Sequence, residues 1–137
     1  MATLLLLRLA TLTGRENYRN LATAVLREVA DQTRRYPSGF GYALSAAAFL
    51  LSTPREVAIL GKDATDIQPM LAETWRRYLP NKVVAVGFGG LELAQITPLL
   101  ANRSLVNGAA TAYVCEHFTC KQPVTEVSAL REQLLTG

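Results

Sequence analysis

Apolar residues follow a helical period through the first fifty positions of the chain. Residues 3–13 are Leu-rich and are followed by Gly14, a residue type that commonly ends helices. Their apolar positions cover most of the helix circumference, which predicts burial on more than one side. A second helix is predicted from the spacing of three and four among the next apolar positions, which are Tyr18, Leu21, Ala22, Val25, Val29 and Ala30.

These segments predict a helical hairpin followed by one more helix. The short turn at Gly14 joins the first two helices in antiparallel fashion. Segment 42–51 is Ala-rich and almost wholly apolar, which is typical of a helix that is buried among others.

The period of the pattern changes at Pro54. Segments 56–61 and 82–87 are short apolar runs that each end in glycine, as buried strands do. Segment 66–79 lies between them with apolar residues at helical spacing, so the three segments predict a strand–helix–strand unit with parallel strands. The remaining elements are a third strand at 109–115 and a final helix at 127–135.

The fold class that follows is α/β in its C-terminal part and α+β for the whole chain. We expect a helical segment at 1–53, then a small α/β domain at 54–137 with a three-stranded, mostly parallel sheet and flanking helices. One face of so small a sheet would depend on the N-terminal helices for cover.

Composition favours a piece that packs against other protein. Charged residues make up 18% of the 137 positions, which is below the usual quarter, and the net charge is only +3. The basic residues are scattered, with pairs only at 34–35 and 76–77 near predicted helix ends, so no nucleic-acid partner is expected. The Leu-rich start is too short to span a membrane and lacks the layout of a secretory signal.

Cysteine usage is equally sparse. Two cysteines and one histidine form no disulfide framework, and a cytoplasmic location is expected. No cofactor is expected. Excess apolar helix surface also predicts that the isolated chain could form a homo-oligomer.

The two cysteines and the histidine lie close together, at Cys115, His117 and Cys120. In an extended strand Cys115 and His117 would share one face, and a turn would bring Cys120 near them. A zinc site needs four ligands, so Glu126 or a partner chain would have to complete it, and no metal is expected. A reversible disulfide also requires a turn. The favoured interpretation is two buried thiols that behave as small apolar side chains.

Residues 61–66 follow the first predicted strand and open a helix. Helix N-termini at strand ends bind anions, so Gly61, Lys62 and Thr65 could contact a phosphate. The pattern matches neither a P-loop nor a dinucleotide fingerprint, and the two aspartates of this segment would repel an anion. A turn with a capping residue is therefore favoured over an anion-binding module.

The second half of the chain resembles a known family. The matching residues are Arg-Glu-Val at 55–57, Ile59, Gly61, Tyr-Leu-Pro-Asn-Lys-Val-Val at 78–84, Thr-Ala-Tyr-Val-Cys-Glu-His-Phe-Thr-Cys at 111–120 and Pro-Val at 123–124. In this order they resemble the C-terminal region of the thioredoxin-domain-containing proteins, a family also named after a spermatogenesis-associated member. The stretch at 113–120 is the most specific piece, whereas the helices before Arg55 match by pattern alone.

The resemblance implies upstream domains in the same protein. Members of the family carry an N-terminal thioredoxin-like domain and then an α/α toroid similar to N-acylglucosamine 2-epimerases and other six-hairpin sugar enzymes. This chain has no Cys-x-x-Cys motif, so the family's redox motif is not carried over. The resemblance favours an accessory, structural role without independent catalysis. The alternatives are a part of a carbohydrate-active or thiol-redox enzyme, or an anion-binding module at 61–66.

Overall fold

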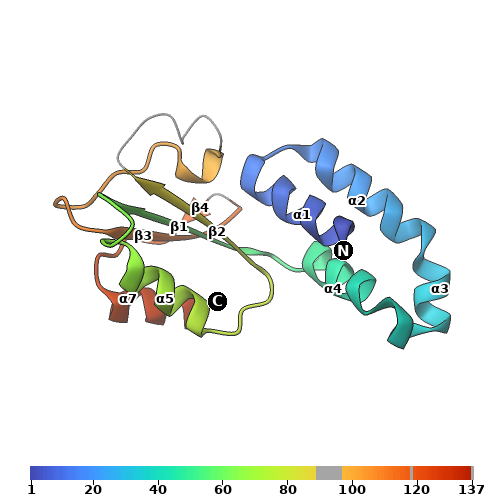
Figure 1. Ribbon diagram of the computed structural model, residues 1–137. Helices are drawn as coiled ribbons and strands as arrows, with labels where there is room; N and C mark the ends of the chain where they lie inside the picture. Colours follow the sequence, from blue (N-terminus) through green and yellow to red (C-terminus); the bar gives the residue numbers. More distant parts are fainter. Residues whose placement is uncertain (89–96, 118, 137) are drawn as a thin grey trace.

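The computed structural model describes residues 1–88, 97–117 and 119–136, and its first half is helical (Figure 1). Gly14 ends the first helix in a left-handed conformation, with φ 68°, and its N–H donates to the Ala10 carbonyl. Glycine adopts this conformation without a steric penalty, so the predicted stop is confirmed. The elements are α1 (Ala2–Thr13), α2 (Glu16–Glu28), α3 (Ala30–Arg35), the 3-10 helix η1 (Pro37–Phe40) and α4 (Gly41–Leu51).

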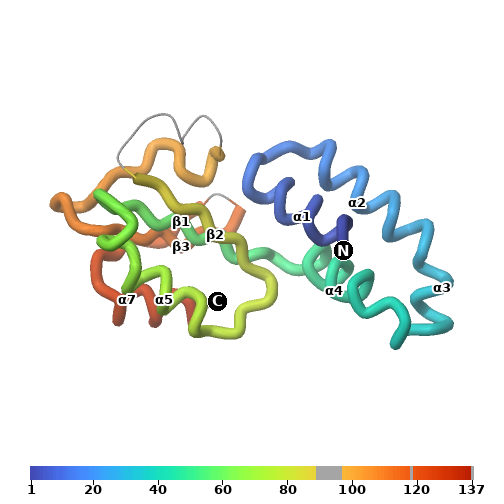
Figure 2. The backbone as a smooth tube through the Cα atoms, viewed as in Figure 1, coloured from blue at the N-terminus to red at the C-terminus, as the bar shows by residue number. Residues whose placement is uncertain are grey.

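Helix α1 is the centre of the helical segment. It packs on both α2 and α4 and also contacts the α/β part of the chain, whereas α3 lies far from the sheet (Figures 1 and 2). Ala22 of α2 and Ala46 of α4 are fully buried, as expected where small side chains let helices approach closely. No helix among the described residues is long and apolar enough to cross a membrane.

The second half of the chain forms a four-stranded mixed sheet in the order β2-β1-β3-β4. Strands β1 and β2 are parallel, with Val57 opposite Val84, and helix α5 lies between them in the chain. This part of the predicted strand–helix–strand unit is confirmed. The elements are β1 (Arg55–Gly61), α5 (Gln68–Arg76), β2 (Lys82–Phe88), the 3-10 helix η2 (Pro98–Leu100), β3 (Thr111–Glu116), β4 (Thr119–Cys120) and α7 (Val127–Leu135).

The expectation of a three-stranded, mostly parallel sheet is corrected. Strand β3 runs antiparallel to β1, and the short β4 continues from it as an antiparallel partner. An apolar strand pattern is the same in either direction, so the sequence predicted the existence of β3 and not its orientation. Strand β4 has two residues, too few to show any period.

Two apolar clusters lie on opposite faces of the sheet. Helices α5 and α7 cover one face, where Val57, Ile59 and Val114 are buried. On the other face Ala58 and Val83 belong to a cluster that includes Leu7 of α1 and Phe49 of α4. The hydrophobic core therefore runs across the predicted boundary between residues 53 and 54, and the helices supply cover for this face of the sheet.

Candidate functional site

Cys115 and Cys120 are joined in a disulfide, so the expectation of two free buried thiols is wrong. The turn after β3 reverses the chain and makes the two residues direct cross-strand partners, with their Cα atoms 3.9 Å apart. Lys121 donates its backbone N–H to the Val114 carbonyl at 2.9 Å, so Val114 and Lys121 form a hydrogen-bonded pair. The cysteines form the neighbouring non-hydrogen-bonded pair, in which the side chains of opposite strands are closest.

The Arg103 guanidinium lies against both sulfur atoms. Its Nη2 is 3.2 Å from Sγ of Cys115 and 2.8 Å from Sγ of Cys120. Its Nη1 donates to carbonyls of the η2 segment, including that of Leu99, and the group lies 5.5 Å from the centre of the Tyr113 ring. Burial lowers the pKa of Arg103, and the charge of Glu56 opposes this shift. The side chain is thus a fixed cation beside the disulfide.

A pocket of about 550 Å³ opens at this site, and Arg103, Tyr113 and Cys120 contribute to its wall. Cys115 is only 1% exposed, whereas Cys120 is partly exposed. His117 lies elsewhere: it is exposed in the turn with φ 50° and lines a separate pocket with Glu56 and residues of α1 and α2. Phe118 lies outside the described residues.

These positions separate the three predicted ligands. The two sulfurs are joined to each other, so neither is a thiolate that could bind zinc in this state. Among the residues that the structure describes, no group of three or more His, Cys, Asp or Glu side chains could hold a metal ion.

The segment at 61–66 forms a turn that is closed by its own carboxylates. Asp63 accepts hydrogen bonds from the backbone N–H groups of Thr65 and Asp66, at 2.8 and 2.9 Å. Asp66 in turn accepts from the N–H of Lys62 at 3.0 Å. The backbone N–H groups of Lys62, Thr65 and Asp66 are thus engaged within the turn. Gly61 serves packing, because a Cβ there would come within 2.4 Å of the Ile67 side chain.

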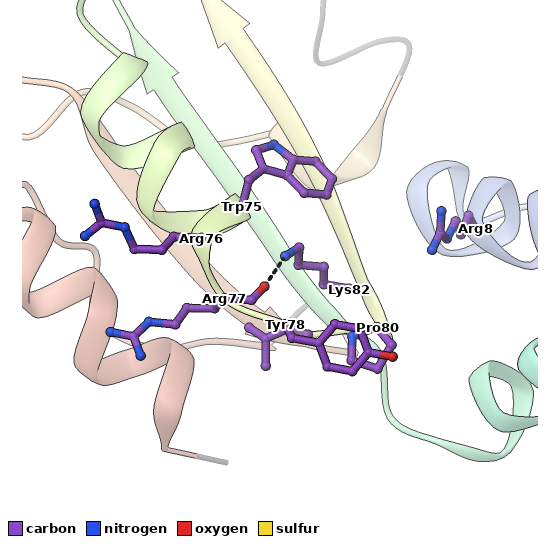
Figure 3. A pocket seen from close by; sticks show the side chains of 8 residues that line it. Arg8, Trp75, Arg76, Arg77, Tyr78, Pro80 and Lys82 are labelled. Atoms are coloured by element: carbon purple, nitrogen blue, oxygen red, sulfur yellow. Dashed lines mark hydrogen bonds between the residues drawn. The ribbon is translucent and has the colours of Figure 1, made fainter.

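A second pocket, of about 470 Å³, lies between α1 and the end of α5 (Figure 3). Trp75 and Tyr78 are 61% and 91% exposed there. The buried amine of Lys82 lies 4.6 Å from the centre of the Trp75 ring and donates to the Thr74 carbonyl at 2.7 Å. Figure 3 shows Arg8 across from them on α1. The pocket thus combines an aromatic platform with positive charge.

One buried carboxylate links α5 to α7. Glu73 is 3% exposed and receives hydrogen bonds from Arg131, at 2.9 and 3.2 Å, and from Arg77 at 3.3 Å. The bond from Arg131 lowers the pKa of Glu73 most, burial opposes this shift, and Arg77 lowers the pKa further. The ion pairs hold the two helices together on the sheet.

Sequence reasoning missed Arg103 and the Trp75 pocket. Arg103 lies twelve positions before Cys115 in a segment without a period, and nothing in the spacing connects the two. Trp75 and Tyr78 match the apolar spacing of a helix, which predicts that they are buried in the core. They are exposed in the structure, and nothing in the sequence indicated a surface pocket beside them.

Comparison with known proteins gives one consistent relationship. The chain is 29% identical to human spermatogenesis-associated protein 20 and 30% identical to the rat protein of that name, in each case over 132 residues and 94% of the chain. It spans 17% of the length of these curated relatives. No protein-family model and no solved structure matches the chain. The predicted resemblance is confirmed: the chain is similar over 94% of its length to spermatogenesis-associated protein 20, and the match is consistent with a C-terminal region of that family.

Proposed function

We propose that this chain is the accessory C-terminal part of a longer protein and packs against upstream domains without independent catalysis. The main observation that supports this proposal is the exposed apolar surface of its helices. Leu21 and Val25 lie one turn apart on the same side of α2 and are 55% and 40% exposed. Leu44 and Leu51 lie two turns apart on α4 and are 44% and 86% exposed. Apolar stripes of this kind favour burial against further protein.

In this proposal the upstream domains of the same protein cover this apolar surface. The relatives are about six times as long as the matched region, so most of their length lies outside it. The family resemblance suggests an α/α toroid before this region, and helical hairpins of a toroid pack side by side. In this proposal α1, α2 and α4 continue such a helical array, and the α/β part terminates it.

The test compares backbone protection in two contexts. Hydrogen exchange would be measured for the 137-residue chain and for the full-length product of its gene. We expect slower exchange in α2 and α4 of the longer protein, with α7 unchanged as an internal reference, because α7 packs within the chain. Equal exchange of α2 and α4 in both contexts would contradict the proposal, and protection that depends on chain concentration would indicate a homo-oligomer instead.

A pair of variants sharpens this test. Leu21→Glu should destabilise the full-length protein by about 1 kcal/mol or more, since roughly half of a leucine side chain would lose its burial. Asn20→Glu, at the neighbouring exposed position, should have little effect. In the 137-residue chain the difference between the two variants should be smaller, because Leu21 is already 55% exposed there.

The pocket beside Trp75 favours a second candidate, participation in carbohydrate binding. Exposed aromatic rings offer an apolar face to a sugar ring, and Arg8 with Lys82 would favour one that bears a negative charge. Trp75 is the only tryptophan of the chain, so its fluorescence reports on this pocket directly. Titration with glucosamine 6-phosphate should change the Trp75 emission in a saturable way, and Arg8→Gln should weaken the response. A linear or absent response at millimolar concentration would exclude this candidate.

A further inference from the structure

The Cys115–Cys120 bridge ties together only a local turn. The two residues are five positions apart and lie on β3 and the two-residue edge strand β4. A disulfide stabilises a fold most when it closes a long loop, because it then removes the most entropy from the unfolded chain. This bridge connects no distant segments, so its contribution to the stability of the fold is a weak explanation for its presence.

Arg103 is better suited to the reduced pair than to the bridge. Sulfur in a disulfide is neutral and a weak acceptor, so it gains little from a guanidinium at 3.2 and 2.8 Å. A thiolate at the same place would form a charge-assisted hydrogen bond, and a nearby cation lowers a thiol's pKa. Carbonyls of the η2 segment hold the guanidinium in position, so it stays beside the sulfurs in either state.

The two sulfurs differ in access. Cys120 contributes to the wall of the open 550 Å³ pocket, whereas Cys115 is 1% exposed behind it. An incoming thiolate would therefore reach Cys120 first. Thiol–disulfide exchange then requires the other sulfur to leave as a thiolate, and a low pKa makes that departure faster.

We propose that Cys115–Cys120 is an exchangeable disulfide that oxidises a dithiol, with Cys120 as the attacked sulfur and Cys115 as the leaving thiolate beside Arg103. A thiolate of the dithiol attacks Sγ of Cys120, the Cys115–Cys120 bond breaks, and its electron pair goes to Sγ of Cys115. The second thiol of the substrate loses its proton to solvent and attacks the substrate sulfur of the mixed disulfide, and the bond between that sulfur and Sγ of Cys120 breaks, so Cys120 is released as a thiolate. Two electrons pass to the protein, and the substrate leaves as a disulfide.

Several charged groups surround the released thiolate. Arg103 contacts both sulfurs, and Glu56 lies opposite Cys115 on β1. Glu116, next to Cys115, has a carboxylate oxygen 3.9 Å from the Arg55 guanidinium. Lys121 lines the same pocket as Cys120. This proposal is independent of the packing role, since the two cysteines lie on β3 and β4 and Arg103 follows η2, whereas the packing role concerns α2 and α4.

The first experiment uses the unaltered protein. It is reduced with dithiothreitol, and alkylation of Cys115 and Cys120 by iodoacetamide is followed by mass spectrometry as a function of pH. We expect reduction with the fold intact and one thiol with a pKa at least one unit below the usual value of about 8.5. Resistance to dithiothreitol in the folded protein, or two thiols that titrate at or above the usual value, would overturn the proposal.

The second experiment removes the cation. In Arg103→Gln the lowered thiol pKa should rise by about one unit or more, and reduction by dithiothreitol should slow roughly threefold. Arg103→Lys should retain part of the effect, because it keeps the charge without the forked geometry. Arg77→Gln is the matched control, a partly buried arginine just after α5 that bonds to Glu73 and should leave both quantities unchanged. Equal thiol pKa values in Arg103→Gln and the unaltered protein would refute the role of Arg103.

Discussion

Leu7→Ala tests whether the helical segment and the sheet unfold as one cooperative unit. Leu7 is 2% exposed, and its cluster includes Ala58 of β1 and Val83 of β2. Removing its side chain leaves a cavity at the junction of the two segments. The substitution lies in α1, yet it should weaken the cover of the sheet.

The expected magnitude follows from cavity formation. Truncation of a fully buried leucine to alanine costs about 2–5 kcal/mol. For a chain of 137 residues the unfolding entropy corresponds to about 3.5 °C per kcal/mol, so the midpoint should fall by roughly 7–17 °C. Far-UV circular dichroism reports mainly on the helices, while Trp75 fluorescence reports on the α/β part. Both signals should shift together.

The refuting outcome is a separation of the two signals. If Leu7→Ala moved the circular dichroism transition and left the Trp75 transition in place, residues 1–53 and 54–137 would unfold as independent domains. Leu5→Ala is the matched control, because Leu5 lies on the same helix and is 58% exposed. It should shift the midpoint far less than Leu7→Ala.

Two further predictions concern the α/β part. Arg131 holds the pKa of Glu73 below its ordinary value of 4.5, so the charged carboxylate stabilises the fold above that pH and the contribution is lost as pH falls through the lowered pKa. Urea unfolding across pH should show this loss, and Glu73→Gln should flatten it; an unchanged pH profile would contradict the assignment. Gly61→Ala should destabilise the fold by about 1–3 kcal/mol, because the added Cβ would collide with the Ile67 side chain. A Cβ added in Gly39→Ala meets no atom within 4 Å, so this control should leave the thermal unfolding midpoint unchanged. Equal unfolding midpoints for the two variants would refute the close packing at Gly61.

The local elements were largely predictable from the sequence. The apolar patterns at 3–13, 56–61, 82–87 and 127–135 predicted two helices and two strands, and the structure contains α1, β1, β2 and α7 there. The second helix is interrupted near Val29, where φ is −95° and ψ is 4°, a break that its apolar spacing did not reveal.

The candidate site was only partly predictable. The cluster of Cys115, His117 and Cys120 was visible, but whether they meet depends on a turn whose geometry the sequence does not specify. The turn pairs the cysteines and exposes His117. Arg103 lies twelve positions before Cys115 in a segment without a period, so nothing in the sequence indicated its contact with the sulfurs.

The sequence by itself determined the order and type of the main elements, because hydrophobic period reflects which side of each segment is buried. It also determined the resemblance to the spermatogenesis-associated family, which rests on residue identities. Tertiary structure decided the direction of β3, the disulfide and the cation beside it. These depend on how the chain turns and on which segments meet, and a periodic pattern carries no information about either.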